Sequence, residues 1–509
     1  MAVQTVQQHR TVADPNAAYL SMRDTWRKNR AVCSGEQAVK EYDSVLDTTG
    51  FTNLLIPFSE KMDARQYLFY KAEAELPGIT AEYLKLLVSS LLRKEPVLKL
   101  PENIDPEAMN WIRNDFGEDG LPLSSVIEEA LTEELLTQRC WIYVDHPYVD
   151  ADSDINPSTY KPYPVIWKAE NVINWTVSKG PNGMRTLTRV VVRQYEERYG
   201  DNEFHPELVD TVYVHEIVDG FYRVRKFQEV EGTDSTTTSE GHVNIDYTKS
   251  SVFEEVEILD SFLIAGKRLD FIPAWPLNGS IPIVKPLISS LVDKEVALYN
   301  KISRRNHLLY GASTYTPYIK TDMIDDEFKK IMDSGLGTWI KLGRDDSIDV
   351  LRTPTEALAD LDRAIAAGVD EMAKLGVRML SPETAQSGVA LQLRNMGQTA
   401  KLGTLNMKVS AIMRAVIAFM LSWRYQTEVK PSEITFSLSE DLTPGVLGEA
   451  WMRLVTEWYE SKLIPRSVWL SAVKQNDILP STYDDEVGRQ EIMADELLIH
   501  NSSNLQQPY

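Results

Sequence analysis

The chain contains few cysteines and histidines for its length. Cys33 and Cys140 are its two cysteines among 509 residues, and its seven histidines are scattered. Two cysteines do not make a disulfide framework, and the histidines lack the spacing of zinc ligands. We therefore expect a protein of a reducing compartment, with Cys140 at a core strand position.

A leader sequence and a long hydrophobic run are also missing. Residues 1–16 include no apolar segment of the kind that a signal peptide carries. The most apolar stretch, 411–423, is shorter than the ~20 residues of a bilayer-spanning helix and contains Arg414. We expect a buried helix there, and no membrane partner.

Positive charge is scarce, with 53 Lys and Arg against 75 Asp and Glu and a formal net charge of −22. Binding to a nucleic acid backbone depends on Lys and Arg, so a conventional DNA-binding protein is disfavoured. The acidic charge is compatible with a protein that lets DNA pass without binding it.

Known catalytic motifs are absent from the sequence. It has no P-loop, dinucleotide fingerprint, HExxH or GxSxG motif. Asp150, Asp152 and Asp154 begin like a calcium loop, but Ile155 stands where the turn glycine belongs. His215-Glu216 fits the half-exposed surface of a strand. We expect no enzyme, no cofactor and no metal site, with a nuclease built on dispersed carboxylates as the weakest alternative.

The first half of the chain predicts a mixed α+β unit. Helical periodicity covers 19–30, 61–95 with a break at Pro77-Gly78, and 122–138 with Ser124 or Ser125 as N-cap. From 163 to 285, runs rich in β-branched and aromatic residues predict successive strands.

The second half predicts two long helices around a small insert. Residues 287–310 are helical by period, and a helix capped by Thr353 follows the insert 312–352. The insert should contain strands at 314–320, 338–342 and 347–351 and a short helix at 325–334. A longer helix (388–426), a strand (434–439) and a helical acidic tail follow. The insert must lie about one helix length from the body, and such a projection buries little alone, so we expect oligomerisation.

Five stretches resemble, in one consistent order, the portal proteins of tailed bacteriophages. They are SLLRKEPVLKLP (90–101), WKAENVINWTV (167–177), AGKRLDFIPAWPLNG (265–279), PLISSLVDKEVALYNKISRRNH (286–307), and LGVRML with ETA (375–385) before a long helix. The resemblance covers about residues 50 to 430. Each motif is weak alone, and their shared order carries the likeness.

The resemblance implies an α+β fold in a ring, most often of twelve subunits, at one capsid vertex. Residues 1–286 would form an arm and wing, 287–311 and 353–380 two stem helices, and 312–352 the clip. Residues 381–388 would form the tunnel loop, 389–445 a wing helix and strand, and 446–509 a helical crown.

It also implies partners and a location. The partners would be the terminase large subunit, the head–tail adaptor or tail proteins, the major capsid and scaffolding proteins, and double-stranded DNA passing non-specifically. The protein would lie in the virion, and in the host cytoplasm during assembly. Another structural head–tail component, such as an adaptor or capsid subunit, is the main alternative.

Particular residues receive roles from the resemblance. The narrowest ring of the channel would be formed by Ser381, Pro382, Glu383, Thr384, Ala385, Gln386, Ser387 and Gly388, unless this is an ordinary interhelical loop. Arg378 and Arg394 would touch phosphates transiently. Clip contacts with partners would involve Asp325, Asp326, Lys329, Lys330 and Trp339. Arg304-Arg305 and Lys329-Lys330 would face acidic runs of a neighbouring subunit, unless all these charges are separately solvated.

Overall fold

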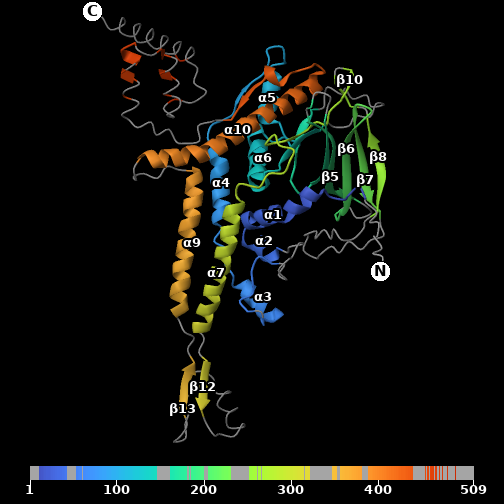
Figure 1. Cartoon of the computed structure of the whole chain (residues 1–509). Coiled ribbons are helices and arrows are strands. Elements are labelled where there is room, and N and C mark those ends of the chain that lie inside the picture. Colours follow the sequence, from blue (N-terminus) through green and yellow to red (C-terminus); the bar gives the residue numbers. More distant parts are fainter. Residues whose placement is uncertain are drawn as a thin grey trace, which may run out of the picture.

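The protein has a mixed α+β body from which two long helices project, with a pair of strands at their far end (Figure 1). The computed structural model describes residues 11–438, apart from 43–52, 60, 146–160, 180–182, 184, 200–203, 231–251, 261, 265, 314–315, 321–346, 352–355 and 381–387, and isolated residues between 453 and 488. For 316–320, 348–351, 356 and 376–401 it describes the backbone alone.

The N-terminal part of the body is helical. Its elements are α1 (Ala17–Ser34), α2 (Glu36–Glu41), α3 (Ala64–Ala72), α4 (Ile79–Leu91), α5 (Glu107–Asn114) and α6 (Leu123–Thr137). The predicted break at Pro77-Gly78 separates α3 from α4, and Gly78 takes a left-handed conformation directly before α4. The predicted cap of α6 is wrong, because this helix begins at Leu123 after Pro122 and has no side-chain cap.

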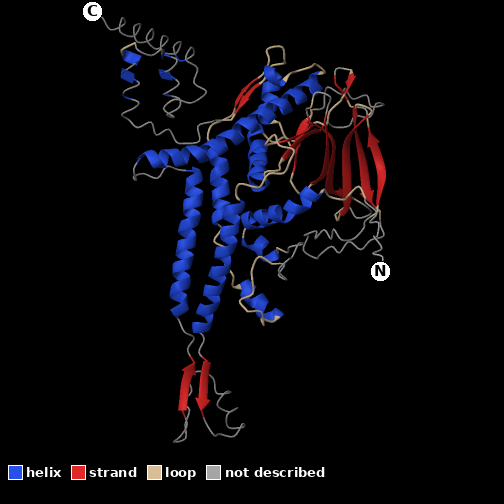
Figure 2. Ribbon diagram, viewed as in Figure 1, coloured by secondary structure: helices blue, strands red, loops and turns tan. Residues whose placement is uncertain are grey.

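Five antiparallel strands form the main sheet, in the order β4-β5-β6-β7-β8 (Figure 2). They are β4 (Val172–Lys179), β5 (Arg185–Arg198), β6 (Glu207–Val218), β7 (Phe221–Glu229) and β8 (Phe253–Leu259). Side chains alternate between its faces: Val190 and Val192 enter the main core, whereas Val191 packs in a second cluster with Tyr19 and Trp26 of α1. This sheet is therefore covered on both faces.

Short strands complete the body. A three-stranded sheet has the order β11 (Ala274–Pro276), β2 (Trp141–Asp145) and β3 (Tyr163–Trp167), and β9 (Leu263–Ile264) pairs with β10 (Lys267–Arg268). Cys140 is fully buried, as predicted, but it lies directly before β2 instead of on the strand. β1 (Val97–Lys99) pairs with β14 (Thr435–Ser437), which follows the 3-10 turn η2 (Pro431–Glu433), so the segment after α10 returns to the segment after α4.

The second half contains α7 (Ser289–Ser313), the paired strands β12 (Thr316–Lys320) and β13 (Ser347–Leu351), α9 (Glu356–Leu380) and α10 (Gly388–Tyr425). Both strands predicted at the ends of the insert are present, and the helix and strand predicted between them lie outside the described residues. α9 ends immediately before Ser381 and Pro382, where the sequence predicts a stop. α10 crosses the top of the body (Figure 1).

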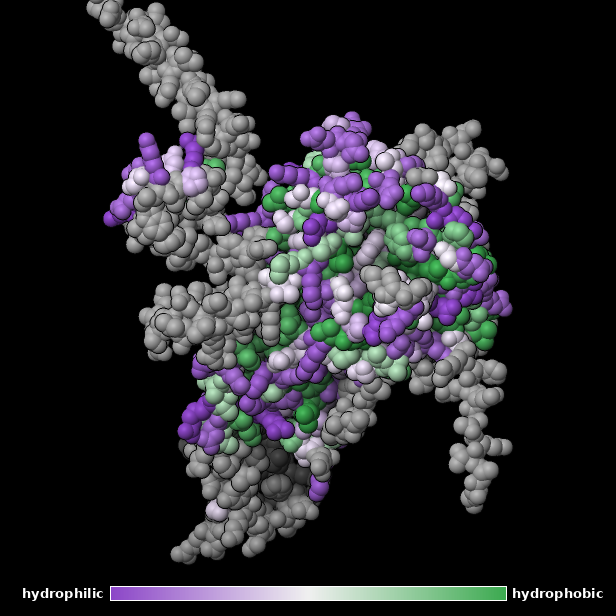
Figure 3. Space-filling model, turned by 45° about the horizontal axis from the view of Figure 1, so that its top comes forward, coloured by the Kyte–Doolittle hydropathy of each residue, from purple (hydrophilic) through white to green (hydrophobic). Residues whose placement is uncertain are grey.

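The 402–425 part of α10 is long and apolar enough to cross a membrane by length and composition. The sequence prediction concerned 411–423, which is only part of this segment, and the prediction that it is buried is confirmed. Val416, Ile417 and Leu421, for example, are almost fully buried in the main core. On the face shown in Figure 3, hydrophobic and hydrophilic residues are interspersed over the described surface.

His215 and Glu216 correct a second prediction, because both are buried rather than half exposed. The Nδ1 atom of His215 lies 2.7 Å from the Tyr222 hydroxyl. Burial lowers the pKa of His215 to about 3, so its ring is neutral. Burial alone would raise the pKa of Glu216, but Arg223, Arg225 and Arg189 bind its carboxylate and lower the pKa overall. Both side chains stabilise the sheet.

Glu134 of α6 gives the fold a testable pH dependence. Its Oε2 atom accepts a hydrogen bond from the Cys140 amide at 3.1 Å, and its Oε1 atom has no hydrogen-bond partner. Burial raises the pKa of Glu134 from 4.5 to about 8. The folded protein thus binds this proton more tightly than the unfolded chain does. Its contribution to stability is complete below about pH 4.5 and is lost as the pH rises to about 8.

We expect Glu134→Gln to flatten this pH dependence. The neutral amide keeps an acceptor for Cys140, and it should raise the free energy of unfolding at pH 7 to 8 by about 3 kcal/mol relative to wild type. At pH 4.5 the two proteins should differ little. Urea unfolding of both chains between pH 4.5 and 8.5 checks this, and equal slopes against pH would contradict it.

Candidate functional site

The candidate site is the projection formed by α7 and α9. Each helix has 25 residues and is therefore about 37 Å long. They lie side by side and run in opposite directions (Figure 1). Lys294 pairs with Glu371 at 2.7 Å, and Arg305 pairs with Asp362 at 2.6 Å, so residue numbers rise on one helix as they fall on the other.

Gly368 sets how closely the two helices approach. A Cβ atom at this position would lie 3.2 Å from Cδ1 of Leu298, which is buried on α7. We expect Gly368→Leu to push the helices apart and to lower the free energy of unfolding by about 2 kcal/mol, as overpacking does. Gly368→Ala is the matched control. The flexible end of Leu298 can give way by a few tenths of an ångström, and alanine favours the helix by about 1 kcal/mol. Urea denaturation of both variants measures their free energies of unfolding. Equal losses of stability in the leucine and alanine variants would contradict this account.

The base of the projection is tied to the body by a buried carboxylate. Glu295 of α7 is fully buried, and its two oxygens accept hydrogen bonds from the amides of Ile79 at 2.9 Å and Thr80 at 2.7 Å. These amides open α4, where N–H groups have no partner within the helix. One side chain thus caps α4 and fixes α7 against it.

Two further contacts hold α7 from its other side. Asn300 donates to the Leu54 carbonyl at 2.9 Å and accepts from the Ile56 amide at 2.8 Å. Lys28 of α1 pairs with Asp293 at 2.5 Å. The upper half of α7 is therefore anchored by three separate parts of the chain.

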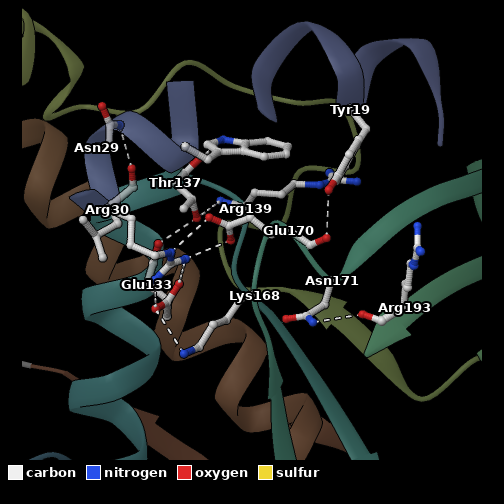
Figure 4. Close-up of polar contacts among 12 residues, drawn as sticks. Tyr19, Asn29, Arg30, Glu133, Thr137, Arg139, Lys168, Glu170, Asn171 and Arg193 are labelled. Atoms are coloured by element: carbon white, nitrogen blue, oxygen red, sulfur yellow. Dashed lines mark hydrogen bonds and ion pairs between the residues drawn. The ribbon is translucent and has the colours of Figure 1, made fainter. Parts of the chain in front are cut away.

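α1 is itself fixed by an ionic network, shown in Figure 4. Arg30 donates to both oxygens of Glu133 on α6, at 2.7 and 2.8 Å, and to both oxygens of Glu170, at 3.0 and 2.8 Å. The Tyr19 hydroxyl donates to the Glu170 carbonyl at 2.9 Å. These hydrogen bonds join α1 to α6 and to the β3–β4 turn, so the network holds the three segments together.

The lower half of the projection is poorly buried. Among the described residues 304–313 and 357–371, no side chain is buried. On α9, Met372 is the first buried residue towards the body. The predicted apolar stripe Leu358, Leu361 and Ile365 is half-buried against α7, and Val369 is exposed. A helix pair with so little burial is marginal alone in water.

The exposed surface of α9 holds its charges in pairs. Arg363 pairs with Asp360 one turn away, and Lys374 pairs with Asp370. The other exposed residues between 357 and 375 are Asp362 and Glu371, which pair with α7, and the small apolar residues Ala357, Ala359, Ala366, Ala367 and Val369. In this described part of α9, both basic side chains are neutralised by a neighbouring acid.

A cleft of about 970 Å³ lies elsewhere, between the start of α1, β4, the loop before α7 and α10. Arg185, Lys285 and Lys408 line it, and its lining contains no Asp, Glu, His or Cys. Within the described ranges, no group of three His, Cys, Asp or Glu side chains is placed to hold a metal ion.

Several predicted site residues lie outside the described residues. These are Asp325, Asp326, Lys329, Lys330, Trp339 and 381–387, as well as the expected cap Thr353. Arg378 lies on α9, and Gly388 and Arg394 on α10, where the backbone alone is described. Arg305 pairs with Asp362 of the same chain, and its expected contact with a neighbouring subunit stays a prediction. Sequence reasoning missed Glu295 and Asn300, which have no local signal, and Gly368, a glycine inside an Ala-rich helical pattern.

Residues 286–424 match a family described as a domain of unknown function, DUF4055. This segment spans α7, α9 and nearly all of α10, about a quarter of the chain. No curated protein matches the chain.

Two of the solved chains that are similar to this one come from one kind of particle. One belongs to the virion of the native gene transfer agent particle, with 10% identity and a TM-score of 0.34 over 85% of this chain and 94% of that chain. The other belongs to the neck of the empty particle, computed with C6 symmetry, with 10% identity and a TM-score of 0.35 over 75% and 85%. TM-scores below 0.5 do not establish a common fold, so these likenesses support no functional assignment.

Proposed function

We propose that this chain is the subunit of a portal ring at one vertex of a tailed-phage capsid. The body would be the wing, α7 and α9 the stem, and the segment carrying β12 and β13 the clip. Residues 381–388 would line the channel, and 446–509 would form the crown. The terminase, the adaptor or tail, and the capsid and scaffolding proteins would dock on this ring, and no catalysis is required of it.

The projection of α7 and α9 is the observation that carries this proposal. Two helices of 25 residues leave an α+β body and end in a strand pair, and the described residues 304–313 and 357–371 include no buried side chain. Neighbouring copies packed around an axis would bury these helices, and a head-to-tail contact that closes makes a ring. Two of the five sequence stretches that resemble portal proteins, 286–307 and 375–385, cover most of α7 and begin on the last turns of α9.

The charge on α9 also suits a DNA channel. In its described part, residues 357–375, the exposed bases Arg363 and Lys374 are paired with acids, and the other exposed residues are acidic or small. A lumen of this kind repels phosphates, whereas free Lys and Arg would release counterions and hold the duplex.

Native mass spectrometry and electron microscopy of the purified chain test the proposal. We expect a closed ring of ten to thirteen copies with an axial hole, and no nucleotide hydrolysis. A stable monomer or dimer over a wide range of concentration and salt would contradict it. A closed particle without an axial hole would favour another structural head–tail component.

The loop 381–388 gives a separate prediction about the channel. We expect Gln386→Trp with Ser387→Trp to narrow the passage, so that packaging of DNA into capsids falls at least tenfold while ring assembly is unchanged. The isosteric Gln386→Glu is the control for general tolerance of substitution. Packaged DNA per capsid is the measurement, and normal packaging by the double tryptophan variant would exclude this loop as the constriction.

A further inference from the structure

The cleft beside the start of α1 is lined by positive charge alone, in a chain whose formal net charge is −22. Its three bases are Arg185 of β5, Lys285 of the loop before α7 and Lys408 of α10, and all three are exposed. Within the part of the chain that the structure describes, none of them forms a salt bridge with an acid. We call this site the basic cleft.

The N-terminus of α1 adds to the positive potential of the cleft. Asn16, Ala18 and Ser21 line it from the cap and first turns of this 18-residue helix. Asn16 accepts a hydrogen bond from the Ala18 amide at 2.9 Å, and no acidic residue stands in the first turn of α1. The positive end of the helix dipole is therefore not neutralised by its own helix, and it favours an anion in the cleft.

A buried arginine lies directly behind the wall of the cleft. Arg139 is 1% exposed, and its guanidinium lies over the Trp175 ring at 4.2 Å from the centroid. Its Nη1 atom donates to the Ile281 carbonyl, whereas Nε and Nη2 have no hydrogen-bond partner among the described residues. Trp175 and Ile281 both line the cleft. The charge of Arg139 thus adds to the potential in the cleft, because low-dielectric walls focus the field.

The buried acid Glu134 does not cancel these charges at neutral pH. It interacts electrostatically with Arg139 and Lys408, but burial raises its pKa to about 8, so it is mostly uncharged at pH 7. Burial lowers the pKa of Arg139 to about 10, so the guanidinium keeps its charge. The region beneath the basic cleft is therefore positive as well.

The wall of the cleft is held in place by hydrogen bonds. Asn278 is buried, donates to the Gln138 carbonyl at 2.8 Å and accepts from the Ser280 amide at 2.7 Å. The cleft has a volume of about 970 Å³, and much of its wall is apolar, formed by Met22, Trp175, Val177, Ile281 and Ile283. An apolar wall with a few convergent polar groups is typical of small-molecule sites.

We propose that the basic cleft binds a small organic phosphate. A phosphate group presents three strong acceptor oxygens and up to two negative charges, so donors on several sides can bind it together. Here the bases come from three different elements and line the same cleft as the first turns of α1. Inorganic phosphate alone would leave most of the volume empty, whereas the apolar wall around Trp175 suits an organic part. This inference does not depend on the proposed ring.

Titration calorimetry of the full chain with ATP in the presence of EDTA tests the assignment. We expect one saturable site per chain at low salt. Lys285→Gln with Lys408→Gln should lower the affinity at least about tenfold, because both charged contacts are lost. The matched control is Lys61→Gln with Lys267→Gln, which removes two charges from exposed positions outside the cleft and should leave the affinity unchanged.

A second pair of variants inserts charge into the cleft. Ala18→Glu places an acid where the dipole of α1 favours one, so the chain should stay folded, and the affinity for ATP should fall at least about tenfold. The neutral Ala18→Gln has nearly the same size and should bind ATP as the wild type does. Circular dichroism checks the folding of both variants, and equal losses of affinity would contradict a site that acts through its charge.

The outcomes decide between a specific site and its alternatives. Saturable ATP binding that the cleft variants weaken and the control variants do not weaken supports the proposal. Equal losses in both lysine pairs would show attraction by overall charge, and they would overturn it, as would a wild type without saturable binding. Citrate binding as tight as that of ATP would overturn the assignment to phosphate. Binding of duplex DNA without binding of ATP would overturn the assignment to a small ligand.

Discussion

Replacing Asp360 and Asp370 with asparagine should convert α9 from a surface that DNA slides past into one that holds it. Each substitution removes the acid that pairs with an exposed base, so Arg363 and Lys374 become free to contact phosphate. Every subunit of the proposed ring would then add two free cations to the channel. We expect at least a tenfold gain in DNA affinity at low salt, because each new phosphate contact releases counterions. Filter binding of duplex DNA to purified rings measures it.

Two controls isolate this effect. Glu82→Gln frees Lys85 on α4, a base that is equally exposed but lies off α9, and it should leave DNA affinity unchanged. Adding Arg363→Gln and Lys374→Gln to the double variant should restore the wild-type affinity. The gain should also shrink as salt rises, with a slope of about −0.9 for each added contact. A double variant whose affinity matches the wild type at every salt concentration would remove α9 from the channel wall.

Helical and strand periodicity predicted most of the described elements. The stripes in 287–310 and 353–380 repeat every three to four residues over a long span, and α7 and α9 form there. The strands from 163 to 285 are rich in β-branched and aromatic residues, which suit a pleated and half-buried surface. The start of α6 was missed because Pro122 allows the helix to begin one residue earlier than the serines.

Burial of polar residues was not predictable in the same way. His215 and Glu216 alternate with apolar neighbours, which normally places one of the two in solvent. His215 is buried among the aromatic rings of Tyr143, Trp167 and Tyr222. Glu216 is buried on the other face, where three arginines bind its carboxylate. The partners of Glu216 lie on adjacent strands, where Arg189 and Arg223 are directly opposite it. Strand register decides these contacts, and it follows from the assembled sheet.

The anchoring of the projection depends on contacts between distant parts of the sequence. Glu295 lies in a helical pattern where a glutamate normally faces solvent, and its partners Ile79 and Thr80 are more than 200 residues away. Gly368 could have been found, since a glycine within a run of alanines costs helix stability and often marks a close approach. The partner of Arg305 follows from the register of α7 against α9.

Glu295→Ala should detach the projection from the body and destabilise the chain by about 4 kcal/mol. The substitution leaves the amides of Ile79 and Thr80 buried without an acceptor, and each unsatisfied buried group costs about 1–3 kcal/mol. It also removes a negative charge from the N-terminus of α4, where the helix dipole favours one. Urea denaturation measures the loss of stability.

The matched control for this prediction is Glu295→Gln, which keeps one acceptor oxygen and nearly the same volume. It should lose about half as much stability as the alanine variant. Asp293→Ala removes an exposed acid two residues earlier on α7, and it should change stability by less than about 1 kcal/mol. If alanine at 295 costs no more than alanine at 293, the carboxylate does not anchor α7. The support of the projection would then lie in the contacts of Asn300 and in the apolar packing of α4 against α7 and α9.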